Sequence, residues 1–278
     1  MKTKNKFILP LLVLILMASC DKVEYQSLSF YTDYLEVPTH GKAFIFPKTG
    51  SGNYTLEVEN PLLFWAEMES GWSNPSGAIA VRGDLKGEAW LTVTDNVTKE
   101  SKRLKIKVTD NYEAMRIYKD YDRENDKAFP LPPSLNNIEW VCLINNTARD
   151  FYLINRESIS LTDYVLKVRG KGTYALSKEG EGYHLTLSYL VDEKEHPTLD
   201  ATSAEPVSYR FRLSQNDYAL HRLNQNLNLG FDTSMPGNWE EFISHAWETN
   251  IGMEGVDTEY RLVGALLPPF EMPVGYLN

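Results

Sequence analysis

Residues 182–191, Gly-Tyr-His-Leu-Thr-Leu-Ser-Tyr-Leu-Val, set the fold class of this chain. Leu185, Leu187, Tyr189 and Val191 occupy every second position, so one face of an extended segment is wholly apolar. A period of two is typical of a β-strand with one buried face. We therefore expect an all-β architecture, built outward from this strand.

The surrounding residues predict a β-rich domain over 138–278. Gly170-Lys-Gly172 and residues 179–182 have the composition of hairpin connections. We expect an antiparallel β-sandwich or an open barrel, with one covering helix near residues 239–247 capped by Asn238. The predicted strands are 139–145, 149–155, 163–169, 172–177, 182–191, 206–214, 218–223 and 259–266.

Residues 27–110 predict a separate β-sandwich. Leu104, Ile106 and Val108 alternate with basic residues, and turn residues such as Gly50-Ser-Gly52 separate the runs. The stretch from Val81 to Val108, which includes Leu91-Thr-Val-Thr-Asp95, resembles the last strands of a bacterial immunoglobulin-like domain. That resemblance implies an immunoglobulin-like sandwich and says little about function.

Residues 111–137 are densely charged and end in prolines, so we interpret them as a connector between the two domains. Within it, alternating acidic residues are similar to a calcium-binding loop. Asn125 stands where an EF-hand requires glycine, and Leu131 stands where it requires glutamate. A solvated linker is the simpler interpretation. The four calcium candidates are Asp120, Asp122, Glu124 and Asp126.

Residues 1–19 have the three parts of an export signal: three lysines, an apolar run from Phe7 to Met17, and small residues before Cys20. The apolar run is too short to span a membrane. With Cys20 as the acylated residue, the segment resembles a bacterial lipoprotein signal. Residues 20–26 then form a tether, and their charges resemble the surface-export signals of Bacteroides-type envelope lipoproteins. The resemblance implies the outer membrane, with exposure at the cell surface as one arrangement.

Composition restricts the partners. The formal net charge is −10, and removal of the signal lysines makes it more negative. This sign opposes binding to nucleic acid, which requires clustered basic residues. Besides a membrane reached through lipid, the expected partners are a polysaccharide or an envelope protein. We expect no cofactor.

No catalytic motif stands out. The chain has no glycine-rich phosphate loop, no GxSxG and no HExxH, and its five histidines are widely spaced. Of the two cysteines, Cys20 is assigned to lipid, so Cys142 has no partner for a disulfide. Its apolar neighbours indicate a buried thiol rather than a nucleophile.

Aromatic residues are 12% of the chain, which suits both β-sheet cores and carbohydrate platforms. The main hypothesis is therefore a non-enzymatic binding lipoprotein of the envelope. The alternatives are a structural or adhesive subunit that assembles by strand addition, and a glycan-acting hydrolase. The aromatic candidates for ligand binding, each weighed against simple core packing, are Trp65, Trp72, Trp140 and Tyr152.

Overall fold

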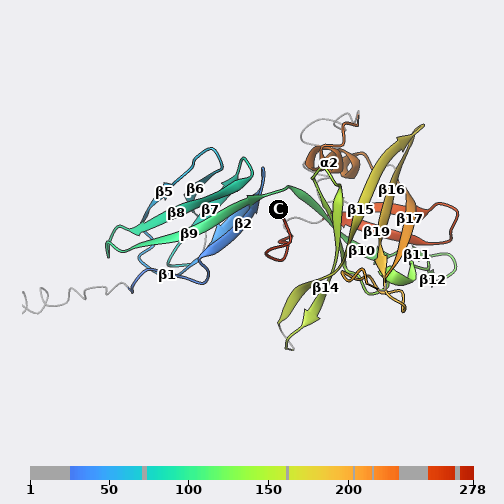
Figure 1. The fold of residues 1–278 in the computed structure, drawn as a ribbon, viewed down its shortest axis with the longest axis horizontal. Helices are drawn as coiled ribbons and strands as arrows, with labels where there is room; N and C mark the ends of the chain where they lie inside the picture. Colours follow the sequence, from blue (N-terminus) through green and yellow to red (C-terminus); the bar gives the residue numbers. More distant parts are fainter. Residues whose placement is uncertain are drawn as a thin grey trace, which may run out of the picture. The chain divides into compact units, whose positions relative to one another are not determined.

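A computed structural model describes residues 26–70, 74–160, 163–202, 204–214, 216–231, 250–266 and 270–278. The described chain is all-β, as the sequence predicts (Figure 1). It divides into two compact units. One holds the chain up to Leu35 with Lys42–Val81 and Glu88–Lys107, and the other holds Glu36–Gly41, Arg82–Gly87 and Val108–Asn278.

The N-terminal strands form two main sheets. Their buried positions follow the predicted alternation, with Leu104, Ile106 and Val108 all at most 1% exposed. The sheets have the orders β2-β9-β8-β5 and β3-β7-β6, and β1 pairs with β4. The bounds are β1 Ser29–Phe30, β2 Tyr34–Pro38, β3 Lys42–Ile45, β4 Pro47–Thr49, β5 Tyr54–Val58, β6 Phe64–Glu69, β7 Ala78–Gly83, β8 Gly87–Asp95 and β9 Ser101–Thr109.

The second unit is a closed barrel of eight strands, each antiparallel to its neighbours. Closure by β10, which pairs with both β13 and β19, distinguishes it from the predicted sandwich or open barrel. In order around the barrel the strands are β10 Tyr112–Lys119, β13 Trp140–Ile144, β14 Asp150–Ser158, β15 Tyr164–Glu179, β16 Gly182–Val191, β17 Glu205–Leu213, β18 Asn250–Gly255 and β19 Arg261–Leu266.

Three local predictions were wrong. Residues 112–119, assigned to the connector, form β10, because Met115 and Ile117 of that segment face the core. Gly170-Lys-Gly172 is no hairpin but the middle of β15. A side chain at Gly172 would lie 2.2 Å from the carbonyl oxygen of Ser188, so the glycine permits close packing of two strands.

The third wrong prediction is the strand at 218–223, which belongs to helix α2, Asp217–Leu227. The side chain of Asn216 caps the helix by accepting a hydrogen bond from the amide of Ala219 at 3.1 Å. The buried residues Leu220, Leu223 and Leu227 recur at helical spacing. The predicted helix near 239–247 lies outside the described residues.

The two ends of the barrel are covered differently. Helix α2 lies at one end (Figure 1). There Tyr183, near the start of β16, packs against Phe231, which follows α2. Toward the other end of the same strand, the hydroxyl of Tyr189 lies 2.6 Å from Ser134 of the short helix η1, Pro133–Leu135. Side chains from the strands, α2 and the η1 segment form one continuous core. The interior is therefore a packed core between two plugs.

A buried ion pair fixes α2 to the barrel. Glu113 of β10 is 2% exposed, and its carboxylate accepts hydrogen bonds from Arg222 at 2.6 and 3.1 Å and from Asn226. Burial raises the pKa of Glu113, while Arg222 and Asn226 oppose that rise. At the end of the helix Arg149 donates to the carbonyl oxygens of Leu227 and Asn228. The polar groups at this end of α2 thus have partners within the barrel.

Candidate functional site

A hollow of about 480 Å³ lies at the η1 end of the barrel, where β16 ends and β17 begins. We call it the mouth pocket. Barrel mouths are frequent positions for ligand sites, because the strands hold the surrounding loops rigidly. Its lining residues are Ser134, Val191, Asp192, Glu193, Glu195, Glu205, Val207 and Tyr209.

One aromatic residue, Tyr209, lines the mouth pocket. Tyr209 is half-buried, and its ring centroid lies 6.1 Å from that of Tyr189 and 6.0 Å from that of Tyr260. Tyr189 is 3% exposed, and burial raises the pKa of its phenol well above the ordinary value, so its hydroxyl stays neutral. Tyr209 therefore offers a ring to a ligand on a firmly packed support.

Carboxylates form the rim. Asp192 accepts hydrogen bonds from the amides of His196 and Lys194, each at 2.8 Å, and these bonds hold its pKa below the usual range. Its carboxylate is thus ionised at neutral pH and acts only as an acceptor. Glu193, Glu195 and Glu205 add three more acidic side chains. This rim can accept hydrogen bonds from hydroxyl or ammonium groups, and it repels anions.

Two of the predicted aromatic residues, Trp140 and Tyr152, lie close together on the outer wall of the barrel, on the neighbouring strands β13 and β14. Both lie beneath the C-terminal tail, residues 270–278. The Phe270 ring lies 4.6 Å from Trp140, and the Tyr152 hydroxyl donates to the carbonyl oxygen of Tyr276 at 2.9 Å. Tyr152 is only 7% exposed, so it packs against the tail instead of presenting a ring to solvent.

The other two predicted aromatic residues are not brought to this wall. Trp65 lies on β6 in the first unit, with 37% of its surface exposed. Trp72 lies outside the described residues. The structure therefore provides no single platform of the four rings among the residues it describes, and a ligand-binding role for Trp65 stays a prediction.

The acidic calcium candidates lie around a small hairpin of β11, Tyr121–Asp122, and β12, Lys127–Ala128. Asp122 accepts hydrogen bonds from the amides of Glu124 and Asn125, and Asp126 accepts one from the Tyr121 hydroxyl. Asp120 accepts one from the Tyr121 amide at 2.8 Å. Within the described ranges no three His, Cys, Asp or Glu side chains are grouped to hold a metal ion. Three of the four carboxylates thus stabilise the hairpin turn.

Cys142 is fully buried and free, as its apolar neighbours predict. It shares a cluster with Met272 and Leu277 of the tail. Burial raises the pKa of this thiol well above its ordinary value, so it is not a thiolate at neutral pH. Its burial and its raised pKa both argue against a nucleophilic role.

Sequence reasoning missed the mouth pocket entirely. The acidic run Asp192-Glu-Lys-Glu195 joins two correctly predicted strands, 182–191 and 206–214. An acidic loop between two adjacent strands can be placed at one end of a barrel only if the sheet is known to close into a barrel. Closure depends on β10, which the sequence did not identify as a barrel strand.

Comparisons with known proteins assign no family. No family model matches the chain, and no curated protein matches it. Among solved structures, domains 5–6 of the S-layer protein SbsC share 12% identity at a TM-score of 0.26, over 66% of this chain and 96% of that one. Human protocadherin-24 EC1-2 shares 10% identity at a TM-score of 0.23, over 66% and 94%. At these values the likeness carries no argument.

None of the described helices has the length and apolar character needed to cross a membrane.

We predict that loosening the tail exposes Cys142. The test uses a chain that starts at Asp21, in which Cys142 is the only thiol. The double substitution Tyr276→Ala and Leu277→Ala removes one aromatic and one aliphatic side chain that pack on the wall. Each buried apolar side chain contributes about 1.5–3 kcal/mol. We expect modification by a thiol reagent to accelerate at least about tenfold while the circular dichroism stays unchanged.

Val274→Ala provides the control, since Val274 belongs to the same tail but is 64% exposed. In this variant the Cys142 thiol should stay as protected as in the parent protein. Equal reaction rates in all three proteins would show that the tail does not protect Cys142.

Proposed function

We propose that this protein is a non-enzymatic envelope lipoprotein, anchored in the outer membrane through Cys20, that binds a neutral, hydroxyl-rich glycan at the mouth pocket. The observation that carries the proposal is the combination of the Tyr209 ring with a rim of four carboxylates. Glycan hydroxyls donate hydrogen bonds to carboxylates, and the apolar face of a sugar ring packs on an aromatic ring.

Charge narrows the ligand class. Four acidic side chains lie around one hollow, and no Lys or Arg is among the described residues that line it. Uronic acids and phosphorylated ligands would meet repulsion there, whereas neutral sugars would not. The low pKa of Asp192 also favours binding over acid catalysis, because a general acid must hold its proton near neutral pH.

The anchor is proposed from residues 1–20 alone. The basic residues, the short apolar run and the small residues before Cys20 support acylation at that cysteine. One acyl chain binds a membrane only marginally, so stable attachment requires more than one. The charged residues that follow support an extended tether leading to the folded units.

The glycan proposal predicts that Glu205→Gln weakens retention of neutral polysaccharides in affinity gels. The substitution removes a charged acceptor from the rim without touching the core, since Glu205 is exposed. Charge-assisted hydrogen bonds contribute about 1.5–3 kcal/mol, so we expect affinity to fall about tenfold or more. Tyr209→Ala should abolish retention.

Glu181→Gln is the matched control, because Glu181 is also exposed but lies in the turn at the opposite end of β16. It should leave retention unchanged. If none of a broad panel of polysaccharides slowed the parent protein in affinity gels, glycan binding at the mouth pocket would be refuted.

The anchor predicts that Cys20→Ala abolishes labelling by a fatty-acid probe and releases the protein from the membrane fraction. Substitution of Cys142, which is buried, should leave the label in place. Equal labelling of the parent and Cys20→Ala would contradict the lipoprotein assignment, independently of any glycan result.

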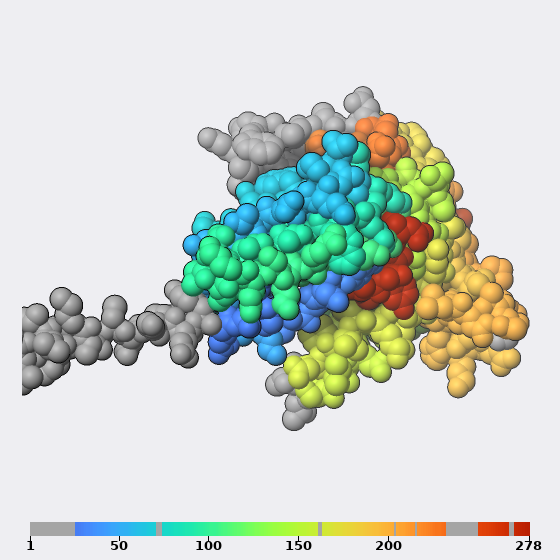
Figure 2. Space-filling model, turned by 60° about the vertical axis from the view of Figure 1, so that its left-hand side comes forward, coloured from blue at the N-terminus to red at the C-terminus, as the bar shows by residue number. Residues whose placement is uncertain are grey.

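A second candidate function is a structural or adhesive subunit. The observation that favours it is the hairpin arm, residues 155–158 and 164–168, which projects from the barrel (Figures 1 and 2). Among the described residues these two segments form strand pairs only with each other, because β13 pairs with β14 up to Ile154 and β15 pairs with β16 from Gly172 onward. The Arg156 amide also donates to the Glu139 carboxylate at 3.4 Å. Apart from the Arg156 amide, the edges of the arm therefore offer backbone groups for strand addition.

The adhesive candidate predicts oligomers whose proportion rises with concentration in analytical ultracentrifugation. Val165→Lys should shift the protein toward the monomer, because a charged residue on an open edge opposes pairing. Val97→Lys is the matched control, since Val97 and Val165 are both 46% exposed and Val97 lies outside the barrel. A parent protein that is monomeric at every concentration would rule out self-assembly through the arm.

A further inference from the structure

A row of polar side chains crosses four adjacent strands on the outer wall of the barrel. The strand registers pair His184 of β16 with Arg212 of β17, Arg212 with Glu254 of β18, and Glu254 with Arg261 of β19. We call these four residues the wall row. Cross-strand neighbours on one face lie close enough to interact, so the row is a single electrostatic unit.

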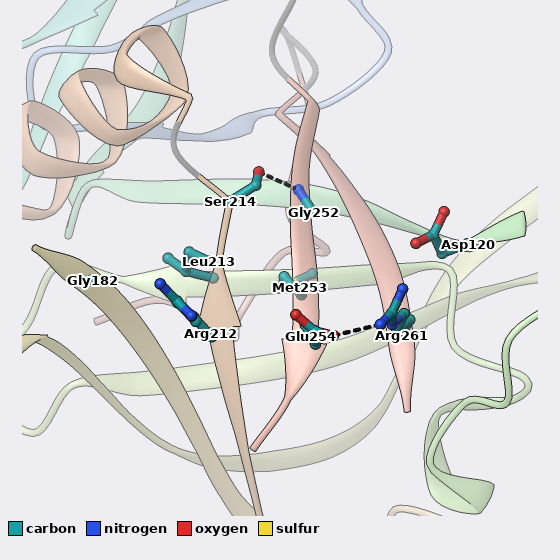
Figure 3. A pocket seen from close by; sticks show the side chains of 9 residues that line it. All are labelled: Asp120, Gly182, Arg212, Leu213, Ser214, Gly252, Met253, Glu254 and Arg261. Atoms are coloured by element: carbon teal, nitrogen blue, oxygen red, sulfur yellow. Dashed lines mark hydrogen bonds and ion pairs between the residues drawn. The ribbon is translucent and has the colours of Figure 1, made fainter. Parts of the chain in front are cut away.

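The two arginines of the wall row differ in whether they form an ion pair. Glu254 lies between two arginines but pairs with Arg261, whose guanidinium is 2.5 Å away. Figure 3 shows these two side chains pointing toward each other, while Arg212 extends toward Gly182. Among the described residues Arg212 has no ion pair. Arg210, two positions earlier on the same strand, is paired with Glu179.

Arg212 lines a hollow of about 400 Å³, the wall pocket, together with Ser214 and Gly252. Ser214 accepts a hydrogen bond from the amide of Gly252 at 2.8 Å, which leaves its hydroxyl hydrogen to donate. The carboxylate of Asp120, at another part of the lining, is engaged by the Tyr121 amide. Arg212 and Ser214 therefore offer donors to this lining, while its second carboxylate, that of Glu254, is paired with Arg261.

His184 adds a further polar atom beside Arg212. Its Nδ1 is shielded from solvent and has no hydrogen-bond partner among the described residues. A methyl group at Gly182 would lie 3.5 Å from Cε1 of His184 and 3.7 Å from Nε of Arg212, so both side chains border the same glycine. A guanidinium and a hydroxyl thus line the wall pocket, and an imidazole lies beside the guanidinium on the neighbouring strand.

We propose that the wall pocket binds a carboxylate, such as that of an acidic sugar, through the guanidinium of Arg212. The planar guanidinium matches a carboxylate with two parallel hydrogen bonds, and Ser214 supplies a third donor. The proposal goes beyond the mouth pocket, where acidic residues disfavour anions. The two hollows share no lining residue, so either can fail alone.

The test is a titration of the full mature chain, labelled with ¹⁵N, with D-glucuronate and with D-glucose. The pair differs in its carboxylate, so we expect glucuronate to shift the Nε–H resonance of Arg212 saturably and glucose to leave it unmoved. Arg212→Gln should weaken glucuronate binding, followed through backbone amides of β17 and β18, at least about tenfold.

Two further variants separate binding from folding. Arg210→Gln removes an arginine from the same strand and face, and should leave glucuronate affinity unchanged. Gly182→Ala adds a methyl group at ordinary contact distance, where the backbone tolerates it, and should weaken binding by narrowing the space at Arg212. The proposal is overturned if glucuronate causes no saturable shift, if glucose shifts the same resonances, or if Arg212→Gln binds glucuronate as the parent does.

Discussion

Strand β10 is the constraint on which the second unit depends. Met115 and Arg116 pair with residues of β13 on one side and of β19 on the other, so a single short segment joins the two ends of an eight-stranded sheet. Met115 and Ile117 turn inward and are at most 7% exposed, and Glu113 of the same strand holds α2 through Arg222. Closure and plugging therefore depend on the same eight residues.

Closure determines where this unit can bind a ligand. Because α2 and the η1 segment join the interior side chains in one core, the lumen is occupied by protein. Among the hollows that described residues line, one lies at the mouth beside Tyr209 and another on the wall beside Arg212. They differ in charge. Carboxylates surround the first, whereas the second contains the guanidinium of Arg212, which has no ion pair among the described residues. Their expected ligands are therefore chemically distinct.

The sequence predicted the strands with clear alternation, such as β9 and β16, and the burial of Cys142. It failed where local pattern conflicts with tertiary context. Gly170 and Gly172 have the composition of a turn but lie within β15. Residues 217–227 contain no glycine or proline that would rule out a strand, yet they form a helix, which buries Leu220 and Leu223 against the end of the barrel. The pocket residues were beyond reach, since Asp192, Glu205 and Ser134 meet only after closure.

Amide hydrogen exchange tests the closed barrel most directly. If β10 closes the sheet, the amide of Tyr118, which pairs with Val263 of β19, should exchange as slowly as those of β15 and β16 within the barrel, while the amides of Asn155–Ser158 in the hairpin arm exchange much faster. Rapid exchange along β10, comparable to that of the arm, would show that the seam is open and would contradict the account.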